Sequence, residues 1–197
     1  METVSSVAPP NPTQTPEGKE PLSKEVTYYA ALWSVGQVRV RELKKKGKVL
    51  PLYYLEVPAY PRSVFLALPQ SFAQPRLGQT IGFSHAPRTD ERAVLKGHLH
   101  YIRHLDPTLW ERAPYFHLRG RLAAVDLEEG QLQVEVRPNP GGKLRAPFTL
   151  TLLAPLSLLE ALPPVGSAVY LEGEVRPRSG RLVVRRWEPA RLWDDPQ

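Results

Sequence analysis

The chain has 197 residues, 22 of them proline, no cysteine and a formal net charge of +6. The lack of cysteine excludes disulfides, thiolate metal sites and cysteine nucleophiles, and no segment approaches the 18 or more apolar residues that cross a bilayer. The N-terminus has neither the basic start nor the apolar centre of a signal peptide. We therefore expect a cytoplasmic protein without a membrane partner. The positive charge favours a polyanionic partner.

Residues 1–24 differ in composition from the rest of the chain. They hold five prolines among Ser, Thr, Gln and Glu, and few apolar residues. A segment of this composition does not bury enough apolar surface to fold by itself. We predict a disordered tail here.

A first β unit is predicted over residues 25–105. Apolar residues alternate with polar ones, or cluster, in segments typical of β-strands at 26–43, 50–57, 63–68, 79–84 and 93–104. Four lysines surround Gly47 at the tip of the first hairpin. Residues 70–74 are too few for more than one helical turn. After the last predicted strand, the prolines within 106–114 indicate a linker.

A second β unit is predicted over residues 115–193. Strands are expected at 117–124, 131–137, 144–153, 168–176 and 181–187. Residues 155–162 have the apolar spacing of a short helix, which the prolines at 163 and 164 would end. Residues 194–197 form a short acidic C-terminus.

The two units carry a repeated pattern. The segment LGQTIGF at residues 77–83 has a counterpart, VGSAVYL, at residues 165–171, and residues 33–38 correspond to residues 116–121. The copies are separated by roughly 85 residues, which indicates two tandem copies of one small unit. The strand order, with one helix between the third and fourth strands of the second unit, predicts an all-β protein of two tandem OB-fold-like five-stranded barrels.

Two short motifs in the second unit resemble a known family. The segments LRGRL at 118–122 and VYLEGEV at 169–175 are similar to the first and fourth strands of bacterial single-stranded DNA-binding proteins of the SSB type. The resemblance implies single-stranded DNA binding in replication, repair or recombination, without catalysis, and replication or repair proteins as partners. Because SSB-type units usually assemble to four OB folds, it also implies a homodimer of this chain.

Single-strand binding requires cations that follow the phosphates and flat side chains that stack on bases. The positive charge lies mainly in the first unit: residues 25–110 hold twelve Lys and Arg against six Asp and Glu, and residues 111–197 hold twelve against eleven. Alternation places Trp33 on one face with Arg39 and Arg41. The predicted nucleic-acid-binding residues are Trp33, Arg39, Arg41, Lys44, Lys45, Lys46, Lys48, Tyr54, Arg119, Arg121, Arg137, Lys143, Arg145, Arg185 and Trp187.

Two alternatives to DNA binding remain open. RNA would suit the same cations and aromatics. The barrels could instead serve as a protein–protein adaptor or structural module, with the basic residues as solvated surface, and the near-neutral second unit favours this hypothesis for that half of the chain.

We predict no enzyme and no cofactor, because the chain has no glycine-rich phosphate loop and no Gly-x-Ser-x-Gly or His-Glu-x-x-His motif. His98, His100 and His104 are interpreted as polar residues on an outward strand face rather than as metal ligands.

Overall fold

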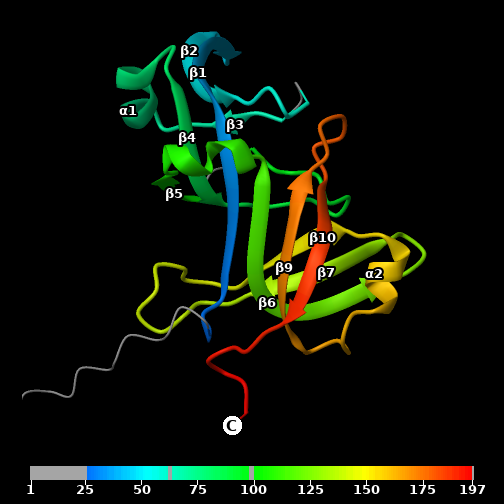
Figure 1. The fold of residues 1–197 in the computed structure, drawn as a ribbon. Coiled ribbons are helices and arrows are strands. Elements are labelled where there is room, and N and C mark those ends of the chain that lie inside the picture. The colour runs from blue at the N-terminus through cyan, green and yellow to red at the C-terminus, as the bar shows by residue number, and fades with distance from the viewer. Residues whose placement is uncertain (1–25, 62–63, 98–99, 197) are drawn as a thin grey trace, which may run out of the picture.

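The computed structural model describes residues 26–61, 64–97 and 100–196. The predicted tail and His98 lie outside these ranges. Ten strands are hydrogen-bonded into one mixed sheet, with a few short helical segments between them (Figure 1). The prediction of a mostly β protein is confirmed. No helix in the described part of the chain is long and apolar enough to span a bilayer.

The second half of the chain closes into a ring of five strands. Its elements are β6 (Tyr115–Asp126), β7 (Gln131–Val136), β8 (Phe148–Leu153), α2 (Leu156–Glu160), β9 (Ala168–Val175) and β10 (Leu182–Pro189). The pairing runs β6–β7–β8–β10–β9 and returns to β6, and the β8–β10 contact is the parallel one. The short helix lies between the third and fourth strands of this ring, as predicted.

Glycines allow the strands of this ring to approach closely. A Cβ added to Gly120 would lie 2.5 Å from the carbonyl oxygen of Glu135, and one added to Gly173 would lie 2.0 Å from that of Val183. The same Cβ on Gly173 would lie 2.6 Å from the ring of Phe116, which is fully buried in the core. These glycines belong to the two motifs of the sequence resemblance, and any larger residue would collide with the neighbouring strand.

The first half forms five strands whose pairing, among the described residues, does not close into a ring. Its elements are β1 (Tyr29–Lys45), β2 (Lys48–Glu56), β3 (Leu66–Ala67), α1 (Gln70–Ala73), the 3₁₀ turns η2 (Gln74–Arg76) and η3 (Pro107–Arg112), β4 (Thr80–Ala86) and β5 (His100–His104). The strands pair in the order β3–β2–β1–β4–β5. The N–H of Ala67 donates to the carbonyl of Gly97 at 3.0 Å, which draws the chain before β5 toward β3.

β1 joins the two halves. Its first residues pair with β6, from Tyr29 opposite Arg119 to Trp33 opposite Tyr115. Its middle pairs with β4 and its end with β2. Both halves contribute to one main cluster of buried side chains, which includes Leu32, Phe83, Phe116 and Leu171.

The last predicted strand of the first unit, 93–104, is shorter in the structure and begins at residue 100. Ala93 has a φ value of 62°, outside the β region. The Asp90 carboxylate accepts hydrogen bonds from the N–H groups of Arg92 and Val94, each at 2.9 Å, and so holds a turn. The chain after this turn contacts the ring instead, since the N–H of Leu182 donates to the carbonyl of Ala93 at 3.0 Å.

We expect Gly173→Ala to lower the free energy of unfolding by about 1–3 kcal/mol, because the added methyl group overpacks the contact with β10 and the core. Urea denaturation measures this change. The control is Gly47→Asn, since Gly47 has a φ of 74° that asparagine tolerates, and an added Cβ there meets no atom within 4 Å. Equal stability of the two variants would contradict the close packing of β9 on β10.

Candidate nucleic-acid interface

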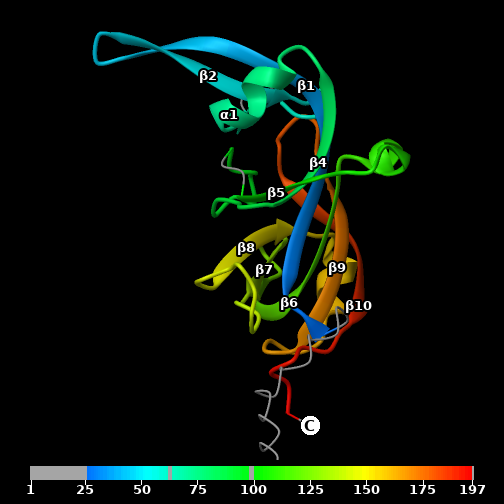
Figure 2. The same cartoon turned by 90° about the vertical axis from the view of Figure 1, so that its left-hand side faces the viewer.

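The hairpin of β1 and β2 extends beyond the core. Val38 and Leu55 are its last fully buried pair, and the hairpin projects from the rest of the molecule (Figure 2). We call residues 39–52 the arm. At its tip, Lys46 and Gly47 have positive φ values of 49° and 74°, as in the two-residue turns that suit the twist of a hairpin.

Cations and aromatic rings meet on the outward face at the root of the arm. Arg39 lies opposite Tyr54 in the register, so the two side chains share a face. The Tyr54 ring packs edge-to-face on Phe65 at 5.5 Å between centroids, and the Arg41 guanidinium carbon lies 3.9 Å from the centre of the Phe65 ring. We call these four residues the arm face. Phe65 was not among the predicted binding residues. It falls in the predicted strand 63–68, but the structure limits β3 to Leu66–Ala67 and places Phe65 in the segment just before it.

The Arg39 side chain also has an acidic neighbour. Its Nε lies 2.9 Å from Oε2 of Glu56, and both side chains are about half exposed, at 48% and 54%. A solvated pair of this kind contributes little to stability. A phosphate oxygen could therefore replace the Glu56 carboxylate at small cost.

Four lysines extend the positive charge to the tip of the arm. Lys44, Lys45, Lys46 and Lys48 are all exposed. Within the ranges that the structure describes, no ion pair involves any of them. The tip is thus a concentration of positive charge without ion pairs among the described residues, at the opposite end of the arm from the aromatic rings of the arm face.

Trp33 lies in a second aromatic group, where β1 meets β6. Its ring centroid is 5.0 Å from that of Tyr115 and 5.3 Å from that of His117, and the Arg112 guanidinium lies 5.1 Å from the Trp33 ring. Burial lowers the pKa of His117, against the nearby carboxylate of Glu172, and so favours the neutral imidazole. Arg112 was missed in the sequence because it lies in the predicted linker.

Arg119 continues this group toward β9. Its guanidinium lies 5.3 Å from the ring of Tyr29 and 5.9 Å from that of Tyr170. The Tyr170 hydroxyl donates to Glu172 at 2.6 Å. The outward face of β9 therefore contributes both a ring and a carboxylate, and the carboxylate would repel phosphate.

Arg121 and Arg137 are engaged by the C-terminal segment. Arg121 Nη2 lies 2.9 Å from Asp194 Oδ1 and 2.7 Å from Asp195 Oδ1, and Arg137 Nη1 lies 3.1 Å from Asp194 Oδ2. Burial raises the pKa of Asp194, but hydrogen bonds from Tyr28 and Arg121 outweigh it and hold this pKa below its ordinary value. The carboxylates therefore neutralise the charge of both guanidinium groups.

The C-terminal segment is held by backbone and apolar contacts as well. Leu192 is buried with Tyr28 and Val136. The N–H of Trp193 donates to the carbonyl of Val26 at 2.9 Å. The segment thus connects the start of the described chain to the ring.

The last strand departs from the predicted alternation. Arg185 and Trp187 are two residues apart in the predicted strand 181–187, so strict alternation would put them on one face, but the register of β10 shifts between Val184 and Arg186. Trp187 lies opposite the core residue Leu171 and packs against the main core. Arg185 is exposed and its Nε donates to Glu174 at 3.0 Å.

Lys143 and Arg145 are exposed in the loop between β7 and β8. The Lys143 carbonyl accepts a hydrogen bond from the Tyr101 hydroxyl at 3.2 Å, so the loop touches β5. The structure therefore groups some predicted binding residues and separates others. Arg39, Arg41 and the four tip lysines lie on the arm, and Tyr54 lies at its root. Trp33 and Arg119 lie at the β1–β6 junction, and the rest lie elsewhere on the ring.

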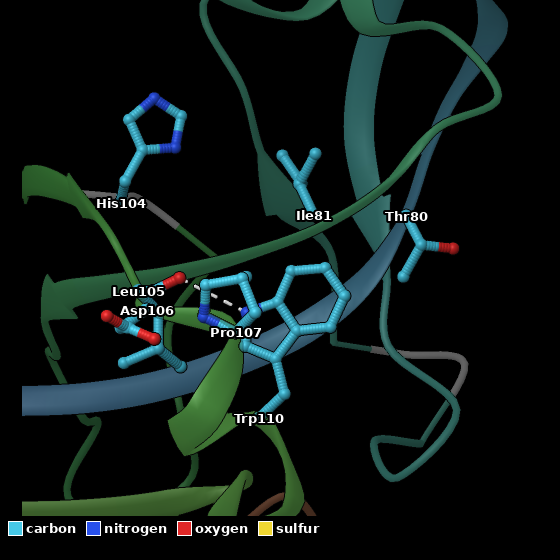
Figure 3. A pocket seen from close by; sticks show the side chains of 8 residues that line it. Thr80, Ile81, His104, Leu105, Asp106, Pro107 and Trp110 are labelled. Carbon is cyan, nitrogen blue, oxygen red and sulfur yellow. Dashed lines mark hydrogen bonds between the residues drawn. The ribbon is translucent and has the colours of Figure 1, made fainter.

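An open hollow of about 430 Å³ lies between β4 and η3 (Figure 3). The indole Nε1 of Trp110 donates to the carbonyl of Leu105 at 3.1 Å, and the indole packs over Gly82. The Asp106 carboxylate on the rim accepts from the N–H and hydroxyl of Thr108. A carboxylate at the rim makes this hollow a poor site for phosphate. In the described residues, no three His, Asp or Glu side chains converge as metal ligands.

No protein-family model matches the chain, and no curated protein matches it. Among solved structures, the fold is distantly similar to a crystal structure of a deletion mutant of the single-stranded DNA-binding protein from Thermus aquaticus. The TM-score is 0.44 and the sequence identity 14%, and the match covers 86% of this chain and 98% of that chain.

We expect Asp194→Asn to lower the free energy of unfolding by about 1–3 kcal/mol at pH 7, since it removes a charged acceptor from two arginines and Tyr28. A carboxylate with a depressed pKa stabilises the fold above its unfolded pKa of about 3.9, and this contribution disappears as the pH falls through the folded pKa. Denaturation at pH 7 and pH 3 should therefore show a difference between wild type and variant that shrinks in acid. Glu174→Gln, which removes an exposed pair, is the control and should change stability by less than about 1 kcal/mol.

Proposed function

We propose that the protein binds single-stranded DNA without catalysis, through the arm face and the lysines at the arm tip. The observation that carries the proposal is the packing of two arginines and two rings at the root of a lysine-tipped hairpin. Tyr54 and Phe65 offer stacking surfaces, and each stacked base contributes about 1–3 kcal/mol. Arg39, Arg41 and the lysines would neutralise the phosphates.

We also propose that both halves are OB-fold-like barrels, closed in the second half and more open in the first. The strand order of the first half, β3–β2–β1–β4–β5, supports this. In OB-folds, oligonucleotides bind the face of the second and third strands and the loop between the first two. The corresponding elements here are β2 with Tyr54, the segment of Phe65 and β3, and the lysine-rich tip.

The second half contributes less to this site. Arg121, Arg137 and Arg185 each face a carboxylate. Trp33 and Arg119 at the junction would extend the path of a strand that leaves the arm face. Replication, repair or recombination is the proposed setting, and RNA is the close variant that competition must distinguish.

The adaptor hypothesis has an observation of its own. The paired arginines of the second half leave a near-neutral surface, which suits a protein partner better than a nucleic acid. Under this hypothesis the arm face would bind no oligonucleotide at low salt.

We expect Tyr54→Ala and Phe65→Ala each to weaken binding of a fluorescein-labelled oligo-dT by about 5- to 150-fold, which corresponds to loss of one stacked base. Fluorescence anisotropy with duplex and RNA competitors measures the affinity and the strand preference. Tyr101→Ala is the matched control, because Tyr101 is an exposed tyrosine away from the arm. Unchanged affinity in both arm-face variants would exclude stacking there.

We expect reversal of the four tip charges (Lys44→Glu, Lys45→Glu, Lys46→Glu, Lys48→Glu) to abolish or strongly weaken binding and to flatten its salt dependence, because each phosphate contact contributes a slope of about −0.7 on single strands. An oligonucleotide of about ten nucleotides keeps the assay to one binding unit. Arg185→Glu, which changes an already paired cation, should leave the slope nearly unaltered. If the quadruple variant binds like wild type, the tip lysines make no phosphate contacts and this part of the proposal is wrong. If wild type binds no oligonucleotide at low salt, the result favours the adaptor hypothesis.

A further inference from the structure

The arm exposes aliphatic side chains that single-strand binding does not explain. Val40, Leu43, Val49 and Leu50 are 42%, 41%, 53% and 46% exposed. Val40 and Val49 lie on one face of the arm, whereas Leu43 and Leu50 are paired on the other. Aliphatic groups neither stack on bases nor bind phosphates, and a hairpin that stands alone is marginally stable. The arm therefore presents a surface suited to another protein surface.

A matching surface lies at the end of the second half. An open hollow of about 330 Å³ lies between the tip of the β6–β7 hairpin and α2, and its apolar lining is Val125, Leu127, Leu159, Leu162, Pro163 and Val165. Leu127 and Val165 are 51% and 59% exposed, as is neighbouring Leu156 at 53%. We call this hollow the groove.

One carboxylate lines the groove, and three more neighbour its lining residues in the chain. Glu160 lies on its wall, and Asp126, Glu128 and Glu129 belong to the hairpin turn beside it. All four are exposed. An apolar hollow with an acidic rim is the complement of an arm with aliphatic sides and a lysine tip.

The two surfaces lie in different halves of the molecule. Figure 1 shows the β1–β2 hairpin at the top and α2 with the β6–β7 hairpin at the right-hand side of the lower half. An arm cannot reach the groove of its own chain. Contact between two arms would bring eight lysines together, and their repulsion disfavours that arrangement.

We propose that the arm of one copy docks into the groove of a second copy, with Val49 on the face opposite the arm face against the apolar lining, and the lysines against the acidic rim. The two surfaces differ, so the contact is head-to-tail and each added copy offers a free arm or groove to the next. The product is an open chain of molecules rather than the closed dimer that the sequence resemblance implies. Nucleic acid is not required, so this inference is independent of the proposed function.

The absence of cysteine in the chain allows a direct test by crosslinking. One full-length preparation carries Val49→Cys in the arm and a second carries Val165→Cys in the groove, and the two are mixed with a short bis-maleimide. We expect a crosslinked dimer in the mixture at least about ten times more abundant than in either preparation alone. A dimer from Val49→Cys alone would show arm-to-arm contact and would overturn the proposal, as would no dimer up to the solubility limit.

Charge exchange provides a second test. Light scattering over a concentration series should show self-association of wild type that weakens at high salt. The tip reversal described above should weaken self-association at least about tenfold. The groove variant, which combines Asp126→Lys, Glu128→Lys and Glu129→Lys, should weaken it by a similar factor. A mixture of the two variants should restore association. Failure of the mixture to associate when wild type does would overturn the docking of arm to groove. The groove variant retains the arm face, so its binding to the short oligonucleotide separates this test from that of the proposed function.

Discussion

The structure depends on one strand that pairs with three others. β1 is 17 residues long, and its successive segments hydrogen-bond to β6, β4 and β2. Because a strand directs alternate side chains to opposite faces, the burial of Leu32 and Val38 requires Trp33, Arg39 and Arg41 to point outward. The same strand thus connects the two halves of the sheet and sets the direction of the arm-face arginines.

The length of β1 also produces the arm. After Val38 no side chain of the strand is buried, so the last residues of β1 and the first of β2 support only each other. An exposed hairpin edge invites pairing with other chains, and charged residues, lysine above all, limit this. The four lysines of the tip can keep the arm soluble, attract phosphates and select an acidic partner surface, because all three depend on the same concentrated charge.

The charge of the two halves is used differently. In the first half the lysines of the arm remain uncompensated by described residues, whereas in the second half arginines are occupied by Asp194, Asp195 and Glu174. The C-terminal residues are thus part of the fold, with Leu192 in a small core of its own. This division is the reason that the proposed polyanion site lies on the arm, with the ring as the scaffold that holds it.

The sequence by itself determined the features that follow from local periodicity. Alternation predicted most of the strands, the outward face of Trp33, Arg39 and Arg41, and the lysine tip, while apolar spacing predicted the short helix before β9. Only the tertiary structure decided what depends on distant partners. The shift in β10 that turns Trp187 inward, the attachment of Ala93 to the ring, the place of Phe65 beside Arg41 and the pairing of Arg121 with Asp194 and Asp195 all arise between residues far apart in the chain. Periodicity determines which way a side chain points along a strand, but long-range packing determines what it meets there.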